Sequence, residues 1–272
     1  MEQMCFGRAD ILLPDFIGDA AACRKWAVVA CDQFTGEPAY WHEVERIVGD
    51  APSTLNMILP EAYLGGDNTA RLDGIAATMR DYRKNLLRPY PDALIYVRRT
   101  QSDGKVRRGI VGAVDLEGYD YAAGSTSPVR ATEGTVLERI PPRVAVRRAA
   151  SLEAPHVMLL IDDPKDAVIG ALEETHGSLH KLYDFELMLG GGRLEGYLLS
   201  AAEADAALAR MQVLFAESGS DLELAVGDGN HSLASAKARY EELKAQIGEA
   251  AARLHPLRYA LCEVVNLHDS AL

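Results

Sequence analysis

The spacing of hydrophobic positions switches between helical and strand-like periods along the chain, which predicts a mixed protein. The clearest helix is expected after Asn68, a residue type that caps helix N-termini. A second helix is expected from Pro38, because proline is tolerated in a first helical turn, and a third from Ser200, where Glu203 completes a capping box. In the first helix apolar residues recur at steps of three and four: Leu72, Ile75, Met79, Tyr82 and Leu86.

Short apolar runs predict the strands. Residues 93–100 and 106–114 flank Asp103-Gly104, a favoured turn pair, so they predict a hairpin. A second hairpin is predicted where residues 181–188 and 196–199 flank three consecutive glycines. Single strands are expected at 26–30, 156–161, 222–226 and 259–265.

Hairpins alternate with helical segments without a repeating strand–helix–strand series, which predicts an α+β fold: a mixed sheet with hairpins and packed helices. One helix, expected over about 136–150, is interrupted in this prediction by Pro141-Pro142. Residues 124–128 (Gly-Ser-Thr-Ser-Pro) are the linker-like stretch. The chain is therefore expected to be a single compact domain or two tightly packed lobes with a boundary near 122–128.

Composition narrows the protein class. The chain has 272 residues, 48% of them hydrophobic and 25% charged, as in an ordinary globular protein. No apolar run approaches the length of a membrane span, no secretory signal pattern is present, and the cysteines show no metal-binding spacing. We therefore expect reduced thiols, a cytoplasmic location and no membrane partner. With 40 acidic against 28 basic residues, no nucleic-acid partner is expected either.

The segment Gly227-Asp228-Gly229-Asn230-His231-Ser232 is the best candidate for chemistry. It follows a predicted strand and opens a predicted helix, whose first N–H groups and positive dipole end favour an anion. The glycines permit close backbone approach, and the acid, amide, imidazole and hydroxyl groups suit phosphate binding and proton transfer. The alternative is purely structural: Asn230 as a helix cap, Asp228 in a turn and His231 on the surface.

Three other groups of residues are weaker candidates. Arg130 can grip an oxyanion and Glu133 can act as a general base, although the same segment also suits a loop that ends in a helix capped by Thr132 or Thr135. Asp32 and Gln33 end an apolar run and either face a cleft or begin a turn. Asp162-Asp163, before a proline, suit a hard cation or an exposed turn. The arginines at 139, 143, 147 and 148 are interpreted as a solvated face.

Four segments together resemble the bacterial family catalogued as domain of unknown function 1015. They occur in the family's order from near residue 11 onward, so the resemblance covers nearly the whole chain: Trp26–Phe34, Asn85–Tyr90, Val129–Thr135 and Gly227–Ser232. The family commonly has histidine and arginine where this chain has Asn230 and Ser232. Relatives are usually longer, so part of the family's domain is expected beyond residue 272.

The Asp-Gly-x-His loop is also similar to one in free-serine kinases of the ParB/sulfiredoxin-like superfamily. This resemblance implies a ParB/sulfiredoxin-like core and a kinase that phosphorylates a small alcohol such as free serine, with ATP, ADP or pyrophosphate as donor and Mg²⁺ as cofactor. Asp228 would bind Mg²⁺, His231 would contact the phosphoryl group and Glu133 would be the base, while Asp32 and Gln33 would bind substrate. The phosphate-binding residues would be Arg130, Thr132, Gly227, Gly229, Asn230 and Ser232. The alternative is a non-catalytic phosphate or nucleotide sensor, and a metal-dependent hydrolase using Asp162, Asp163 and His231 is the third hypothesis.

Overall fold

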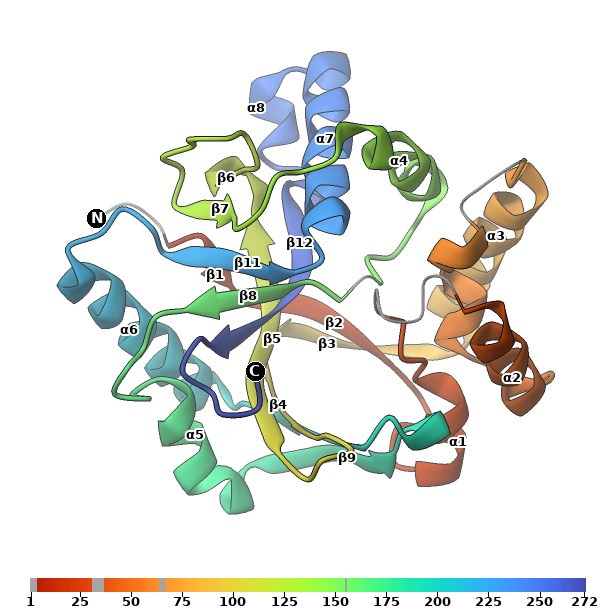
Figure 1. The fold of residues 1–272 in the computed structure, drawn as a ribbon, viewed down its shortest axis with the longest axis horizontal. Coiled ribbons are helices and arrows are strands. Elements are labelled where there is room, and N and C mark those ends of the chain that lie inside the picture. Colours follow the sequence, from red (N-terminus) through yellow and green to blue (C-terminus); the bar gives the residue numbers. More distant parts are fainter. Residues whose placement is uncertain (1–3, 31–36, 64–66, 155) are drawn as a thin grey trace.

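The computed structural model describes residues 4–30, 37–63, 67–154 and 156–272, and within them helices surround one large sheet and a smaller ribbon (Figure 1). The helices are α1 (Ala20–Trp26), α2 (Pro38–Val48), α3 (Thr69–Asn85), α4 (Ile140–Ala149), α5 (Ile169–Thr175), α6 (Ala201–Ser218), α7 (Asn230–Ile247) and α8 (Glu249–Ala252). The strands are β1 (Phe6–Gly7), β2 (Ala9–Pro14), β3 (Leu87–Ala93), β4 (Ile95–Thr100), β5 (Val106–Asp115), β6 (Tyr119–Asp120), β7 (Val129–Ala131), β8 (Met158–Ile161), β9 (His180–Glu186), β10 (Arg193–Leu198), β11 (Leu224–Asp228) and β12 (Tyr259–Asn266).

The large sheet has ten strands among the described residues, in the order β6-β7-β11-β8-β12-β5-β4-β10-β9, with β1 also paired to β5. Neighbours are parallel between β6, β7 and β11 and between β8 and β12, and antiparallel elsewhere. This confirms the predicted α+β class with a mixed sheet and packed helices. A ParB/sulfiredoxin-like core stays a prediction.

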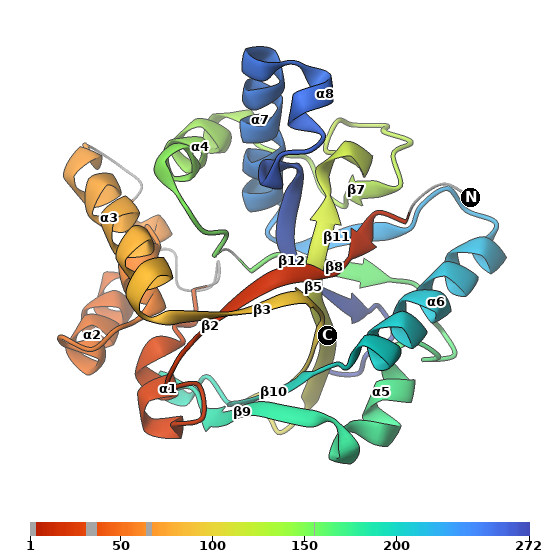
Figure 2. The same ribbon diagram turned by 180° about the vertical axis from the view of Figure 1, so that it is seen from behind.

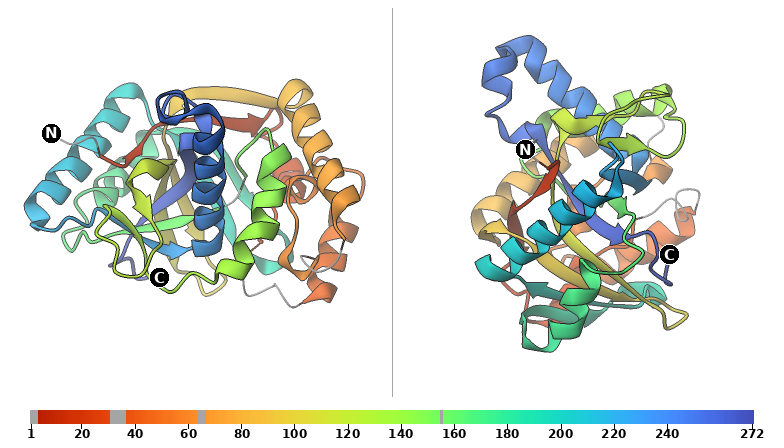
Figure 3. Two further views of the ribbon diagram at one scale, coloured as in Figure 1. Left: turned by 90° about the horizontal axis from the view of Figure 1, so that it is seen from above. Right: turned by 90° about the vertical axis from the view of Figure 1, so that its left-hand side faces the viewer.

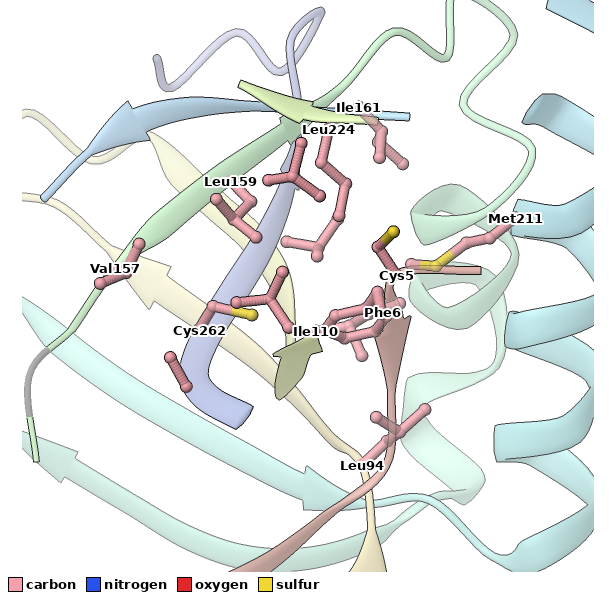
Figure 4. Close-up of a cluster of buried hydrophobic side chains, with 14 of the residues drawn as sticks. Cys5, Phe6, Leu94, Ile110, Val157, Leu159, Ile161, Met211, Leu224 and Cys262 are labelled. Atoms are coloured by element: carbon pink, nitrogen blue, oxygen red, sulfur yellow. The ribbon is translucent and has the colours of Figure 1, made fainter. Parts of the chain in front are cut away.

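Side chains alternate along the strands, so the two faces of the sheet contribute to two different hydrophobic cores. On β4, Tyr96 belongs to the main core, whereas Ile95 and Val97 belong to the opposite face. The main core lies between the sheet and the buried faces of α5, α6 and α7, and Figure 4 shows its side chains converging from Phe6, Ile110, Leu159 and Met211. Figure 2, from behind, shows α5 and α6 together over one end of the sheet.

The opposite face is covered by a ribbon of β2 and β3 that pairs antiparallel, with Leu12 opposite Pro89. Beside this ribbon, Trp26 packs with Met57, Ile75 and Met79 from α3 and a neighbouring turn. The predicted strand at 26–30 is therefore wrong. The Asp19 carboxylate accepts N–H groups of the next turn and starts α1, which ends at Trp26, and the described residues that follow are not in a strand.

Most of the other predicted elements are confirmed. Both hairpins form, as β4–β5 and β9–β10, and the capping box opens α6. Pro141 and Pro142 do not interrupt a helix, because α4 begins at Ile140 and places both prolines in its first turn, where no N–H donor is needed. Residues 121–128 connect β6 to β7, which are adjacent in the same sheet.

The helices that position the site lie side by side. Figure 3 shows α4 next to α7, and Ile140, Val144 and Ala234 form the apolar contact between them. Across the described chain, no helix combines the length and apolar character needed to cross a membrane.

The capping box of α6 gives a direct test of local stability. Ser200 Oγ accepts the Glu203 N–H at 3.3 Å, and Glu203 Oε2 accepts the Ser200 N–H at 2.7 Å. We expect Ser200→Ala to lower the free energy of unfolding by about 1 kcal/mol in urea titrations. In a double-mutant cycle with Glu203→Ala, the double variant should lose less than the sum of the single losses, because both bonds belong to one box. Strictly additive losses would contradict this reciprocal arrangement.

Candidate functional site

The candidate site forms where the carboxyl ends of two neighbouring parallel strands meet. In the pairing of β7 with β11, Ala131 lies opposite Val226, so the segments after both strands leave the same edge of the sheet. The Thr132 hydroxyl donates to the Val226 carbonyl oxygen at 2.7 Å and ties the two strand ends together. Segments 94 positions apart in the sequence are therefore joined at one edge, where ligands of α/β sheets commonly bind.

Two glycines shape the turn from β11 into α7. Gly227 lies at a register shift in the pairing of β11 with β8, and a Cβ added there would come within 2.8 Å of the Leu160 side chain. Gly229 has φ +85°, a left-handed conformation that disfavours other residues. Its position also abuts the neighbouring strand, since an added Cβ would lie 3.3 Å from the His156 carbonyl oxygen. The glycines thus serve backbone geometry, as the sequence predicted.

The start of α7 presents polar groups at this edge. The Asp228 side chain is exposed, and its Oδ1 accepts the Gly229 N–H at 2.7 Å. The first helical bond runs from the Leu233 N–H to the Gly229 carbonyl, so the preceding N–H groups belong to the unsatisfied first turn. Asn230 is only 6% exposed, and its Oδ1 has no hydrogen-bond partner within the described residues. A buried acceptor of this kind normally has a donor.

His231 connects the two site segments. Its Nε2 accepts the Val136 N–H at 3.3 Å, across 95 positions of sequence. A nitrogen that accepts a hydrogen bond carries no proton, so neutral His231 has its proton on Nδ1 and can donate from there. The imidazole thereby fixes the segment after β7 against the start of α7. Ser235 Oγ donates to the His231 carbonyl oxygen and fixes the same helical turn.

An arginine does reach the loop, although it is not the one that the sequence suggested. Arg147, on α4, donates from Nη2 to the carbonyl oxygen and the Oγ of Ser232 at 3.2 and 3.3 Å. Its Nη1 is bonded to both carboxylate oxygens of Glu153. Arg147 was interpreted from the sequence as part of a solvated helix face. Its spacing among other arginines held no signal of this contact, which depends on how α4 packs against α7.

Arg130 is not brought to the loop. Its guanidinium donates to the carbonyl oxygens of Ser127 and Thr126 and forms an ion pair with Asp221 at 2.7 Å. These partners precede β7 and β11, at the opposite end of the strands from Asp228. The Asp221 partner holds the guanidinium there, and the hydrogen bond from Arg130 lowers the pKa of the Asp221 carboxyl.

The remaining predicted residues fall in three places. Glu133 is exposed in the segment after β7, one residue beyond Thr132 and at the same edge as Asp228. Asp32 and Gln33 lie outside the described residues. Asp162 and Asp163 follow β8 at the other edge of the sheet, where Asp162 bonds His268 and buried Asp163 accepts the Val168 N–H. The hydrolase hypothesis, which joins them to His231, is therefore not supported by this geometry.

Within the described residues, no three histidine, cysteine or acidic side chains gather as a metal site. This arrangement still fits Mg²⁺, which is commonly held by one or two carboxylates together with substrate phosphates and water. Exposed Asp228 is the carboxylate at the loop. A zinc-type site built by the protein alone is not formed by these side chains.

His156 is a neighbour of the site that sequence reasoning did not single out. Its carbonyl oxygen lies against Gly229, and the pairing of β8 with β11 brings it to the same edge as Asp228. In the sequence it was only the first residue of a predicted strand. The hydrogen bond between its Nε2 and the carboxylate of Glu263, 107 positions later, has no signature in the local sequence.

The conformation of Gly229 leads to a testable difference between two glycines of the site. Gly229→Ala forces a Cβ into a left-handed conformation against the His156 carbonyl, so we expect a loss of about 1–2 kcal/mol in unfolding free energy, measured by urea denaturation. Gly134→Ala is the matched control, because an added Cβ there meets nothing within 4 Å. Equal effects of both substitutions would show that the turn does not require glycine.

A comparison with protein-family models matches residues 18–272 to the family described as "Protein of unknown function (DUF1015)". The match includes both site segments, from Val129 to Val136 and from Gly227 to Ser232. Comparisons with curated proteins and with solved structures give no match. Because the family model spans nearly the whole sequence, the chain belongs to the DUF1015 family.

Proposed function

We propose that the protein is a small-molecule phosphotransferase that moves a phosphoryl group from a nucleotide or pyrophosphate to an alcohol such as free serine. One observation carries the proposal: the Thr132–Val226 and Val136–His231 hydrogen bonds join the two segments that resemblance assigned to phosphate binding. Phosphoryl transfer demands mainly positioning and charge neutralisation. A rigid edge that presents a helix N-terminus, a carboxylate and an imidazole suits that demand.

The donor phosphates would lie at the first turn of α7. Gly227 and Gly229 let the turn into α7 lie close against β8 and the segment before it, and the N–H groups of the helix start favour an anion. Two buried polar atoms beside this position have no partner in the described chain, Asn230 Oδ1 and Thr135 Oγ1. A buried water would supply the hydrogen bond that each of them lacks.

Charge neutralisation would come from a divalent cation and from His231. Mg²⁺ bound through Asp228 and the donor phosphates would reduce the negative charge on the transferring group. His231, which the Val136 N–H holds at this edge, would contact the transferring phosphoryl group. Arg130 is left out of the proposed site because Asp221 holds it elsewhere.

A non-catalytic phosphate or nucleotide sensor remains the second candidate, and one observation favours it. Both arginines associated with the site segments are paired with carboxylates, Arg147 with Glu153 and Arg130 with Asp221. Paired guanidinium groups neutralise less charge on a transferring phosphoryl group than unpaired ones. A sensor would bind pyrophosphate or ADP without releasing a phosphorylated alcohol.

The two candidates are separated by product formation. We expect the protein, incubated with serine, Mg²⁺ and either ATP, ADP or pyrophosphate, to give a phosphoserine signal in ³¹P NMR. Asp228→Ala should reduce the initial rate at least about 100-fold, since it removes the carboxylate proposed to hold the cation. The Thr132→Val variant, which loses the bond to Val226, should reduce the rate through mispositioning.

Glu138→Gln is the matched control. Glu138 is another exposed acidic residue of the segment that follows β7, but it lies beyond the bond between Val136 and His231. The Glu138→Gln variant should form phosphoserine at the rate of the wild type. Binding of pyrophosphate by calorimetry with no product from any donor would refute the phosphotransferase and leave the sensor.

A further inference from the structure

A single carboxylate is buried in the middle of an otherwise apolar strand. Glu263 lies on β12 and is 2% exposed, between Cys262, Val264 and Val265, which are equally buried. Since Cys262 and Val264 belong to the main core, alternation places Glu263 on the opposite face of the sheet. Removing a charge from water is costly, and an apolar residue of similar volume commonly serves stability as well or better. Stability alone therefore does not account for this residue.

The carboxylate has two cationic or titratable partners. Glu263 Oε2 accepts from Arg107 Nη2 at 3.0 Å and lies 2.5 Å from His156 Nε2. Burial raises the pKa of Glu263, but the hydrogen bond and charge of His156, with the charge of Arg107, outweigh it and lower the pKa below its ordinary value. Glu263 is thus ionised and holds the proton of the imidazole on Nε2. In the described chain Glu263 Oε1 has no partner.

Of the three side chains in this network, the imidazole of His156 is the most exposed to solvent. The Glu263 and Arg107 side chains are 3% and 12% exposed, whereas the His156 side chain is 54% exposed. With the proton fixed on Nε2, the lone pair of Nδ1 is left to accept a proton. A buried carboxylate behind an exposed imidazole is the arrangement by which proteins orient a histidine base and stabilise its charged form.

The backbone of His156 lies at the edge that carries the proposed site. The Glu263 N–H donates to the Val157 carbonyl at 2.8 Å, which fixes the segment that begins β8 on the central strand. The carbonyl oxygen of the preceding residue, His156, faces Gly229 of the phosphate-binding turn. The histidine is thereby held beside the backbone proposed to bind the donor phosphates.

We propose that His156 is the general base of this site, and that Glu263 is the positioning residue that fixes its tautomer and balances its charge. The inference rests on the proposed phosphotransferase and adds the identity of its proton acceptor. It replaces Glu133, whose exposed carboxylate has no hydrogen bond from the described residues that would hold it in one direction.

The alcohol O–H gives its proton to His156 Nδ1 while its oxygen forms a bond to the phosphorus of the donor. The bond from phosphorus to the leaving oxygen breaks, and that oxygen keeps the electron pair. The products are a phosphate ester, the shortened donor and an imidazolium that Glu263 stabilises from 2.5 Å away.

The other groups around Glu263 do not compete for this role. Arg107 stays protonated at all working pH values. Burial, followed by the nearby charge of Glu263, raises the pKa of Tyr183, which therefore stays neutral. The charge of Glu153 contributes to the raised pKa of Cys262, but both carboxylate oxygens of Glu153 accept hydrogen bonds from Arg147 Nη1.

The test compares pH–rate profiles of phosphoserine formation, followed by ³¹P NMR with pyrophosphate or ATP as donor. His156→Gln should lower kcat at least about 100-fold, in the range of a lost general base. Glu263→Gln keeps an acceptor for the Nε2 proton but removes the charge. The acidic limb of the profile should then move about one unit to lower pH, because the protonated base loses its anionic partner. A purely structural glutamate would leave the limb in place.

His268→Gln is the matched control, because His268 Nε2 is likewise bonded to a carboxylate, Asp162 Oδ1 at 2.7 Å, and its side chain is 46% exposed. It lies past the other end of β8 and should keep the wild-type profile. Circular dichroism melting verifies that each variant is folded, and the largely exposed His156 makes His156→Gln the safer variant.

The outcomes separate the two proposals. No product from the wild type with any donor overturns the phosphotransferase and with it the base. Product from the wild type together with an unimpaired His156→Gln, or an acidic limb that disappears in Glu133→Gln, overturns only the assignment of His156. A large loss in His156→Gln with a shifted limb in Glu263→Gln supports it.

Discussion

The insertion of β12 between β5 and β8 is the constraint on which the rest of the structure depends. Among the described strands, the sheet order places β6, β7, β11 and β8 on one side of β12 and β5, β4, β10 and β9 on the other. Only β12 joins the two groups, antiparallel to β5 and parallel to β8. Its residues are almost all buried, so the two halves share one core through it.

This position explains why a charge on β12 matters to the site. The strand that joins the halves passes next to the segment that begins β8, and β8 borders the turn after β11. Glu263 therefore reaches Arg107 from one half and His156 from the other. Tolerance of this buried charge depends on both partners, because removal of either leaves an uncompensated carboxylate in the sheet.

The sequence predicts what is decided locally and fails where tertiary packing decides. The hairpin turn at Asp103-Gly104 and the capping box at Ser200 are local chemistry, and both are confirmed. The ribbon of β2 and β3 was missed, because Pro89 and Pro91 argue against a strand, although a two-stranded ribbon consists only of edges, where proline is tolerated. At 26–30 the apolar pattern fitted a strand, but Trp26 ends α1 and residues 27–30 are in neither a helix nor a strand.

The same distinction between local chemistry and tertiary packing applies to the candidate site. The turn at Gly227 and Gly229 was found from residue types, since its geometry is local. The sequence favoured Arg130 over Arg147, and only packing shows that Asp221 holds the first while the second reaches Ser232. The pair of His156 and Glu263 joins an ordinary polar residue to an ordinary acidic one, and no pattern in either neighbourhood points to the other.

The hydrogen bonds that assemble the candidate site also determine when it can form during synthesis of the chain. Thr132 finds Val226 94 positions later, and His156 finds Glu263 107 positions later. While the chain is being synthesised, the early half of the site therefore exists without its partners, and the edges of β5 and β8 stay open to wrong pairing until β12 has been made. Such long-range closure is slow compared with the local hairpins. The candidate site therefore forms only after β11 and β12 have been made and have paired with the earlier strands.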